Sequence, residues 1–135
     1  MKKVIVMKLK RTLITILASI SLFGTIGCGA ASNGYVSITP QEAKRIMDTE
    51  KGYVVVDVRN ADEYAQGHIP NAKLLPLPSI ENIALNELPD KKQQLLVYCR
   101  SGVRSKKAAN ILDKLGYTNI KEFGGIIDWP YDINK

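Results

Sequence analysis

Apolar and polar positions follow two different periods along this chain, and together they predict short strands separated by helices. Mainly apolar runs at Tyr53–Val58 and Gln93–Cys99 are typical of strands that are buried on both faces of a parallel sheet. Weaker strand patterns lie at 35–38, 72–77 and 119–123. Strands that alternate with helices form α/β folds, so we expect an α/β domain with a central parallel sheet of about five strands.

Residues that cap helices mark where the predicted helices begin and end. Thr39 and Glu42 have the spacing of a capping box at the start of a helix. Asn60 and Glu63 repeat this spacing before a short helix that stops at Gly67. The four predicted helices cover residues 40–50, 61–66, 80–88 and 104–115, with Ser79 as a candidate cap for the third.

Residues 1–27 have the pattern of an export signal. The first 12 residues hold five basic side chains and no acidic one, and 14 uncharged, mainly apolar residues follow at Leu13–Ile26. A transmembrane helix needs about 20 apolar residues, so this shorter run favours a signal peptide over a membrane span.

Cys28 follows this run after a single residue, Gly27, and this arrangement resembles the lipobox of bacterial lipoproteins, whose cysteine carries the lipid. Thr25 departs from that motif, which usually has an aliphatic residue three positions before the cysteine. We expect a signal peptide at 1–27, lipid on Cys28, a tether at 28–35 and one domain at 36–135. The domain would then be exported and lipid-anchored, on the outer face of the cytoplasmic membrane or in the periplasm. A plain secretory signal and an uncleaved anchor are the alternatives.

The net charge of the chain depends strongly on this first segment. The whole chain has 19 basic and 13 acidic residues, a net charge of +6. Residues 1–27 hold five of the basic residues and no acidic one, which leaves 14 basic and 13 acidic residues and a net charge of +1. Nucleic-acid binding requires a basic surface on the folded domain itself. We therefore expect no nucleic-acid partner, and we expect a monomer.

The chain has two cysteines, and lipid on Cys28 would leave Cys99 without an intrachain partner. An unpaired thiol is unusual in an exported protein, so Cys99 is a candidate functional residue. The alternative is a buried cysteine that acts as a small apolar side chain. His68 is the only histidine, so the three or four ligands of a zinc site are not available, and we expect neither a metal nor a cofactor.

The residues around Cys99 favour a reactive thiol. Cys99 comes at the carboxyl end of a predicted central strand, where ligands bind in open α/β sheets. The chain then turns into a helix whose first amides carry partial positive charge, and Gly102 allows the backbone to bend. These amides, together with the guanidinium groups of Arg100 and Arg104, are expected to lower the thiol pKa from about 8.5.

Three segments of the chain resemble the single-domain rhodaneses, which are thiosulfate sulfurtransferases, and the resemblance covers residues 36–135. Val54–Ala72 matches the family's Asp-x-Arg and Glu-x-x-x-Gly-His-Ile-Pro-x-Ala pattern without a gap. Val97–Ser105 matches its Cys-x-x-Gly-x-Arg loop, and Phe123–Asp132 is the third matching segment. The resemblance implies a rhodanese-like α/β fold with helices on both faces of the sheet.

The same resemblance implies a reaction. Cys99 attacks the outer sulfur of thiosulfate and carries it as a persulfide until a thiol or cyanide accepts it. Arg104 is the expected second catalytic residue, because its planar fork can hold two oxygens of the anionic donor. The residues expected to contact the donor are Arg100, Ser101, Gly102, Val103 and Ser105. The alternative for Arg100 is that it faces solvent, and the alternative for Ser101 and Ser105 is that they only cap the helix.

Other residues that match the family are expected to be structural. Asp57 and Arg59 have the spacing of the family's Asp-x-Arg pair, for which we expect a hydrogen-bonded or ionic contact. The resemblance implies a structural role for His68, and a thiolate that amides already stabilise needs no general base. Trp129 and Tyr131 are expected to close the core.

Two other classes of function remain possible for this loop. Phosphatases and arsenate reductases of the rhodanese fold typically place five residues between the cysteine and the arginine, whereas four separate Cys99 from Arg104. A non-catalytic binding module of the same fold is the other alternative. Such modules often lose the active cysteine, which this chain keeps.

Overall fold

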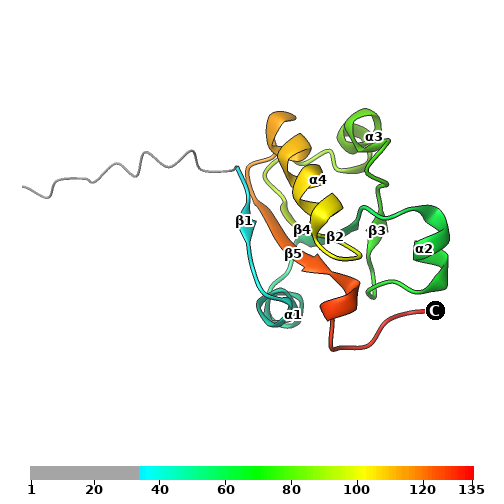
Figure 1. The fold of residues 1–135 in the computed structure, drawn as a ribbon. Helices are drawn as coiled ribbons and strands as arrows, with labels where there is room; N and C mark the ends of the chain where they lie inside the picture. The colour runs from blue at the N-terminus through cyan, green and yellow to red at the C-terminus, as the bar shows by residue number, and fades with distance from the viewer. Residues whose placement is uncertain (1–33) are drawn as a thin grey trace, which may run out of the picture. The chain divides into compact units, whose positions relative to one another are not determined.

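The structure is a computed structural model, and it describes residues 34–135 (Figure 1). The predictions for residues 1–27, for Cys28 and for most of the tether at 28–35 lie outside the described residues. Within the part that is described, every helix is too short or too polar to cross a membrane.

The described chain folds around one parallel sheet of five strands, in the order β1-β5-β4-β2-β3. In chain order the elements are β1 (Val36–Ser37), α1 (Pro40–Thr49), β2 (Tyr53–Asp57), α2 (Ala61–Gln66), β3 (Lys73–Leu74), α3 (Ile80–Glu87), β4 (Gln94–Cys99), α4 (Val103–Lys114), β5 (Ile120–Gly125) and the short 3₁₀ helix η2 (Ile126–Asp128). The predicted α/β class and the five-stranded parallel sheet are confirmed.

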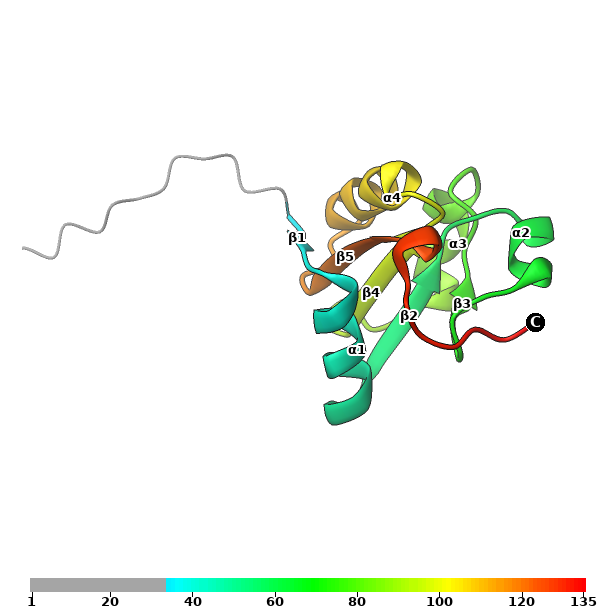
Figure 2. The ribbon, with the colours of Figure 1, turned by 60° about the horizontal axis from the view of Figure 1, so that its bottom comes forward.

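The central strand β4 is buried on both faces, as its apolar run predicted. Leu95, Val97 and Cys99 point into a core that α3 and α4 cover, whereas Leu96 and Tyr98 point into a second core under α1. This alternation follows from the two-residue period of a strand. Figure 2 shows the resulting layers, with α3 and α4 on one side of the sheet and α1 on the other.

The caps of the helices only partly follow the predicted pattern. The Thr39 hydroxyl accepts a hydrogen bond from the Glu42 amide at 3.1 Å, which caps α1. The Glu42 carboxylate binds Arg45 at 2.7 and 2.9 Å, so only one half of the expected capping box forms. Ser79 precedes α3 but makes no side-chain cap, because its hydroxyl donates to the Pro76 carbonyl. The expected role of Ser79 as a cap is therefore wrong.

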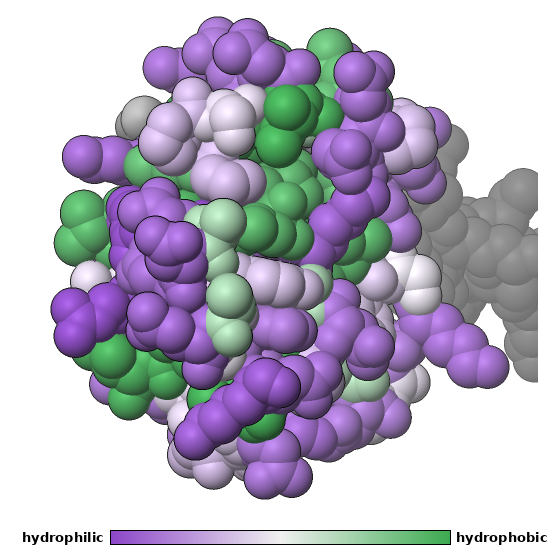
Figure 3. Space-filling view, turned by 90° about the vertical axis from the view of Figure 1, so that its right-hand side faces the viewer, coloured by the Kyte–Doolittle hydropathy of each residue, from purple (hydrophilic) through white to green (hydrophobic). Residues whose placement is uncertain are grey.

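The surface over α2 and α3 is mainly polar, with small apolar areas between the polar side chains (Figure 3). Large apolar residues that stay exposed elsewhere include Val103 and Ile127, which are 62% and 61% exposed. Both belong to segments at the carboxyl ends of β4 and β5, where the candidate site lies.

Candidate active site

The site is built on a short loop between the last residue of β4, Cys99, and the first residue of α4, Val103. Gly102 has a φ of 102°, in the left-handed region that favours glycine, and the helix begins directly after it. The Gly102 amide donates to the Cys99 sulfur at 3.0 Å. The backbone of the loop therefore curls around the sulfur.

The neighbouring strand β5 holds this loop closely. One extra residue in β5 shifts the register with β4, so that Val97 pairs with Glu122 and Cys99 pairs with Gly125. A Cβ atom on Gly125 would lie 1.8 Å from the Arg100 carbonyl oxygen, so only glycine fits there. The loop and the end of β5 thus form one tightly packed unit.

Cys99 is 1% exposed, and it is a free cysteine. Burial alone raises the pKa of its thiol, because the interior disfavours the charged form. Hydrogen bonds from the Ser105 hydroxyl and from the amides of Ser105, Gly102 and Ser101 act in the opposite direction and outweigh burial. The net effect is a lowered pKa, which increases the fraction of thiolate, the nucleophilic form of cysteine.

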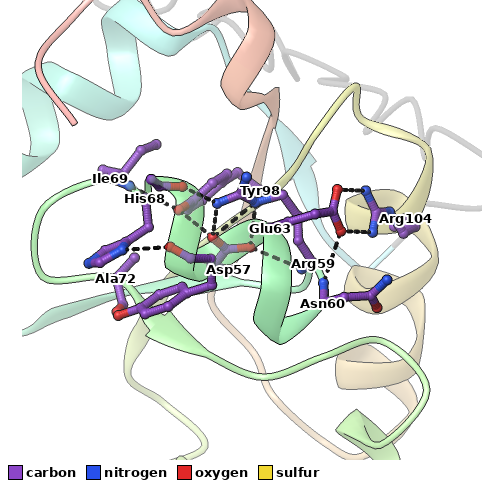
Figure 4. A network of polar contacts seen from close by, with 11 residues as sticks. Asp57, Arg59, Asn60, Glu63, His68, Ile69, Ala72, Tyr98 and Arg104 are labelled. Atoms are coloured by element: carbon purple, nitrogen blue, oxygen red, sulfur yellow. Dashed lines mark hydrogen bonds and ion pairs between the residues drawn. The ribbon is translucent and has the colours of Figure 1, made fainter. Parts of the chain in front are cut away.

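Arg104 lies in a different environment from the one expected. Its Nη1 and Nη2 atoms donate to the two carboxylate oxygens of Glu63 at 2.7 and 2.8 Å, so its fork already holds a carboxylate (Figure 4). This bond is the main reason why the pKa of Glu63 falls to about 2. The pKa of Arg104 is raised mainly by its bond to Glu63, against the effect of burial, and to a smaller extent by the charge of Cys99.

The other loop positions divide into exposed and buried groups. Arg100, Ser101 and Val103 are exposed, whereas Gly102 and Ser105 are buried. The Ser105 hydroxyl lies 3.5 Å from the Cys99 sulfur and faces the interior of the domain.

A cavity of about 300 Å³ lies beside Arg100. It has charged and polar side chains as well as apolar ones, and its lining residues are Arg59, Glu63, Gln66, Gly67, Arg100, Ile126, Ile127 and Ile133. An anionic ligand in this cavity would meet the exposed guanidinium of Arg100.

A buried network of polar contacts lies one strand away, at the end of β2 (Figure 4). Arg59 donates to both carboxylate oxygens of Asp57, at 3.0 Å from Nε and 2.7 Å from Nη2, and it also donates to the Gly67 carbonyl at 2.7 Å. The Tyr98 hydroxyl donates to Asp57 at 2.6 Å and accepts from the Ile69 amide. Burial, followed by the bond to Asp57, raises the pKa of Tyr98. The network links β2, β4 and the 67–69 segment.

His68 contacts the elements around this network. Its ring stacks on Tyr64 with centroids 3.8 Å apart, and its Nδ1 atom lies 3.0 Å from the Tyr64 carbonyl oxygen. Its backbone pairs with Asn134, so it ties the C-terminal segment to α2.

Trp129 and Tyr131 lie on the α1 side of the domain. Trp129 is buried against Phe123 and meets the edge of Tyr131. Both line a cavity of about 510 Å³ that also borders α1, whereas the cavity beside Arg100 contains neither. Among the described residues, no group of three or more His, Cys, Asp or Glu side chains is placed to hold a metal ion.

The comparison with known proteins agrees with this architecture. The sequence model of the rhodanese-like domain family matches residues 39–130. This chain belongs to the rhodanese-like domain family. The predicted family and the predicted helices on both faces of the sheet are therefore confirmed.

Several curated relatives of this rhodanese domain are sulfurtransferases. A sulfurtransferase of Allochromatium vinosum is 42% identical over 88 residues, which cover 64% of this chain and 79% of the relative. The thiosulfate sulfurtransferase PspE of Escherichia coli is 36% identical over 73 residues, which cover 54% of this chain and 70% of PspE. These relatives support sulfurtransferase activity in the broad sense.

Solved structures show the same fold. A rhodanese-like domain protein from Staphylococcus aureus has a TM-score of 0.66 and 35% identity, and the match covers 73% of this chain and 96% of that chain. A structure described as a rhodanese with anions, from E. coli, has a TM-score of 0.58 and 32% identity, covering 62% of this chain and 98% of that chain.

The sequence analysis did not single out Tyr98 and Glu122, whose side chains form buried hydrogen bonds near the site. Glu122 follows Ile120 by two positions in β5, so it lies on the face that packs against α4. A carboxylate on the buried face of a predicted strand was the available signal. Tyr98 precedes Cys99 in β4, so its side chain points to the opposite face of the sheet, toward Asp57.

Proposed function

We propose that this rhodanese domain transfers sulfane sulfur from thiosulfate to a thiol or to cyanide through a persulfide on Cys99. The observation that carries the proposal is the position of the Cys99 sulfur. It is a free thiol at the carboxyl end of a central strand, it accepts the Gly102 amide at 3.0 Å, and its pKa is lowered. A nucleophilic cysteine needs this kind of environment.

The proposed reaction has two displacement steps at sulfur. The Cys99 thiolate attacks the outer sulfur of thiosulfate, the new S–S bond forms, and sulfite leaves with the electron pair of the broken bond. The outer sulfur of the persulfide then carries the negative charge, and the loop amides stabilise it. A thiolate or cyanide attacks this outer sulfur, and Cys99 leaves as a thiolate. No oxidant or reductant is needed beyond the donor and the acceptor.

Two arginines supply positive charge for the anionic donor in this proposal. Arg100 is exposed beside a cavity, so its guanidinium is free to meet the sulfonate oxygens. Arg104 adds charge near the sulfur while its fork holds Glu63. Relatives that are named thiosulfate sulfurtransferases support thiosulfate as the donor.

We also propose that the domain works outside the cytoplasmic membrane, anchored by lipid on Cys28. The basic start of the chain, its 14-residue apolar run and the position of Cys28 support this proposal. The anchor leaves Cys99 as the one thiol available for sulfur chemistry, because the chain has only two cysteines.

Thiocyanate formation from thiosulfate and cyanide tests the proposed reaction. We expect the purified protein to form thiocyanate, the Cys99→Ser variant to form none, and the matched Cys28→Ser variant to keep the activity of the unchanged chain. Thiocyanate formation by Cys99→Ser, or none by the unchanged chain, would contradict the proposal.

A further inference from the structure

A buried carboxylate lies directly beneath the candidate loop. Glu122 is 2% exposed, although a buried carboxylate is unfavourable unless it has partners. Among residues 34–135, no basic side chain forms an ion pair with it. Its oxygens accept hydrogen bonds from the Ser105 hydroxyl at 2.7 Å, the Gly124 amide at 2.7 Å and the Ser37 hydroxyl at 3.2 Å.

Ser105 connects this carboxylate to the nucleophile. Its Oγ atom lies 2.7 Å from Glu122 Oε1 and 3.5 Å from the Cys99 sulfur. A hydroxyl group has a single hydrogen to donate. If Glu122 is a carboxylate while Cys99 is a thiolate, only one of these two buried anions receives that hydrogen. The other anion then lacks a hydrogen bond from Ser105. The free-energy cost of this loss is large, because the surroundings of the buried anion have low polarity.

One additional proton removes this conflict. A protonated Glu122 donates to Ser105. The Ser105 hydroxyl then donates to the Cys99 thiolate in preference to the neutral carbonyls of Gly102 and Gly124, which lie 3.0 and 3.3 Å from its Oγ atom. In the alternative arrangement, the Cys99 thiol donates to Ser105 and Ser105 donates to the Glu122 carboxylate. Both arrangements contain the same atoms and the same net charge of one negative unit, and both satisfy every group in the chain of hydrogen bonds.

We propose that Glu122 stores the proton that Cys99 gives up, with Ser105 as the link between them. In the free protein, the thiol proton has moved from the sulfur to Ser105 Oγ while the Ser105 hydroxyl proton has moved to Glu122 Oε1. The reverse movement restores the thiol, so no base from solvent is needed. Glu122 touches no substrate and is thus a positioning residue. The proposal rests on the proposed function only in that Cys99 reacts as a thiolate.

The other charged groups near the Cys99–Ser105–Glu122 hydrogen bonds do not bond to Ser105. Arg104 is near Cys99, but its fork holds Glu63. Lys106 and Asp128 are exposed, and they line with Glu122 a cavity of about 420 Å³ on the β1 side of the loop. Neither Lys106 nor Asp128 bonds to Ser105. Asp128→Asn is therefore a matched control, because it removes a nearby carboxylate that is not hydrogen-bonded to Ser105.

Spectroscopy on the full chain in a Cys28→Ser background tests the proposal, and all variants share this background. Ultraviolet absorption reports the Cys99 thiolate, and the infrared carbonyl stretch reports a protonated carboxyl group. At neutral pH ordinary exposed carboxyls are ionised, because their pKa values are near 4, so a protonated-carboxyl band identifies a buried acid. We expect both signals together in the parent protein and in Asp128→Asn.

The remaining variants distinguish Glu122 from Cys99, the two residues that Ser105 links. Glu122→Gln is expected to keep the thiolate signal and to lose the carboxyl band, and Cys99→Ala is expected to lose both. A thiolate signal without a carboxyl band in the parent, the absence of a thiolate signal, or a carboxyl band that persists in Cys99→Ala would overturn the proposal. These signals require no sulfur donor, so they do not depend on whether thiosulfate is the substrate. Cys99→Ala keeps the test decisive even if Glu122→Gln does not fold.

Discussion

Replacing Glu63 by Gln is expected to lower the free energy of unfolding by removing one charge from a nearly isosteric side chain. In the folded domain the Glu63 carboxylate holds both terminal nitrogens of Arg104, at 2.7 and 2.8 Å, and accepts the Asn60 amide at 3.0 Å. Glutamine keeps an oxygen for the amide but loses the charged contact with Arg104. The change therefore isolates the ion pair from the helix cap.

The size of the effect follows from the pKa of Glu63. Its fall from 4.5 to about 2 corresponds to an upper limit of about 3.5 kcal/mol, at about 1.4 kcal/mol per pKa unit. The two side chains are 26% and 30% exposed, so solvent screens part of this interaction. We therefore expect Glu63→Gln to cost about 1–2 kcal/mol at neutral pH.

The pH dependence of this cost is the sharper part of the prediction. Because folding lowers the pKa of Glu63, its contribution is fully present above pH 4.5 and disappears as the pH falls toward about 2. Denaturant unfolding of both proteins at pH 7 and pH 3 measures the difference, which should shrink to about half or less at pH 3. An equal difference at both pH values, or none at pH 7, would refute the role of the ion pair.

Three further predictions address the loop and the anchor. Arg104→Ala is expected to reduce kcat/KM for thiosulfate about tenfold or more, because it removes a positive charge from the loop and leaves Glu63 unpaired. Arg104→Lys keeps the charge, so its kcat/KM should fall less. Unchanged kinetics in Arg104→Ala would exclude a role of Arg104 in the reaction with thiosulfate. Gly125→Ala must displace the Arg100 carbonyl, so thermal unfolding should show a cost of about 2 kcal/mol or more, and a fully stable variant would contradict the packing. Cys28→Ser should move the protein from the membrane fraction to the soluble fraction on cell fractionation with sulfur transfer intact, and unchanged attachment would indicate an uncleaved anchor.

Much of the fold was predictable because its signals are local. The apolar runs of β2 and β4 indicated strands that are buried on both faces, and the sheet confirms them. The N-cap at Thr39 was likewise visible in a few adjacent residues. Ser79 shows the limit of such local patterns, since its hydroxyl had a nearer partner in the Pro76 carbonyl.

The side-chain partners within the site were not predictable, because they come from distant parts of the chain. Arg104 and Glu63 are 41 positions apart, and Ser105 and Glu122 are 17 apart. Only the packing of α2 and β5 around the loop brings these pairs together. Cys99 could be chosen as a candidate from the sequence because its context is local: a strand end, a glycine turn and the first amides of a helix.

The measurement that tests the central claim most directly is the intact mass of the purified protein after incubation with thiosulfate. If Cys99 is the sulfur carrier, the protein should gain one sulfur atom, cyanide should remove it as thiocyanate, and peptide mapping should place it on Cys99. The Cys99→Ser variant should gain nothing. A protein that stays at its original mass, or that carries the added sulfur on a residue other than Cys99, would contradict the account.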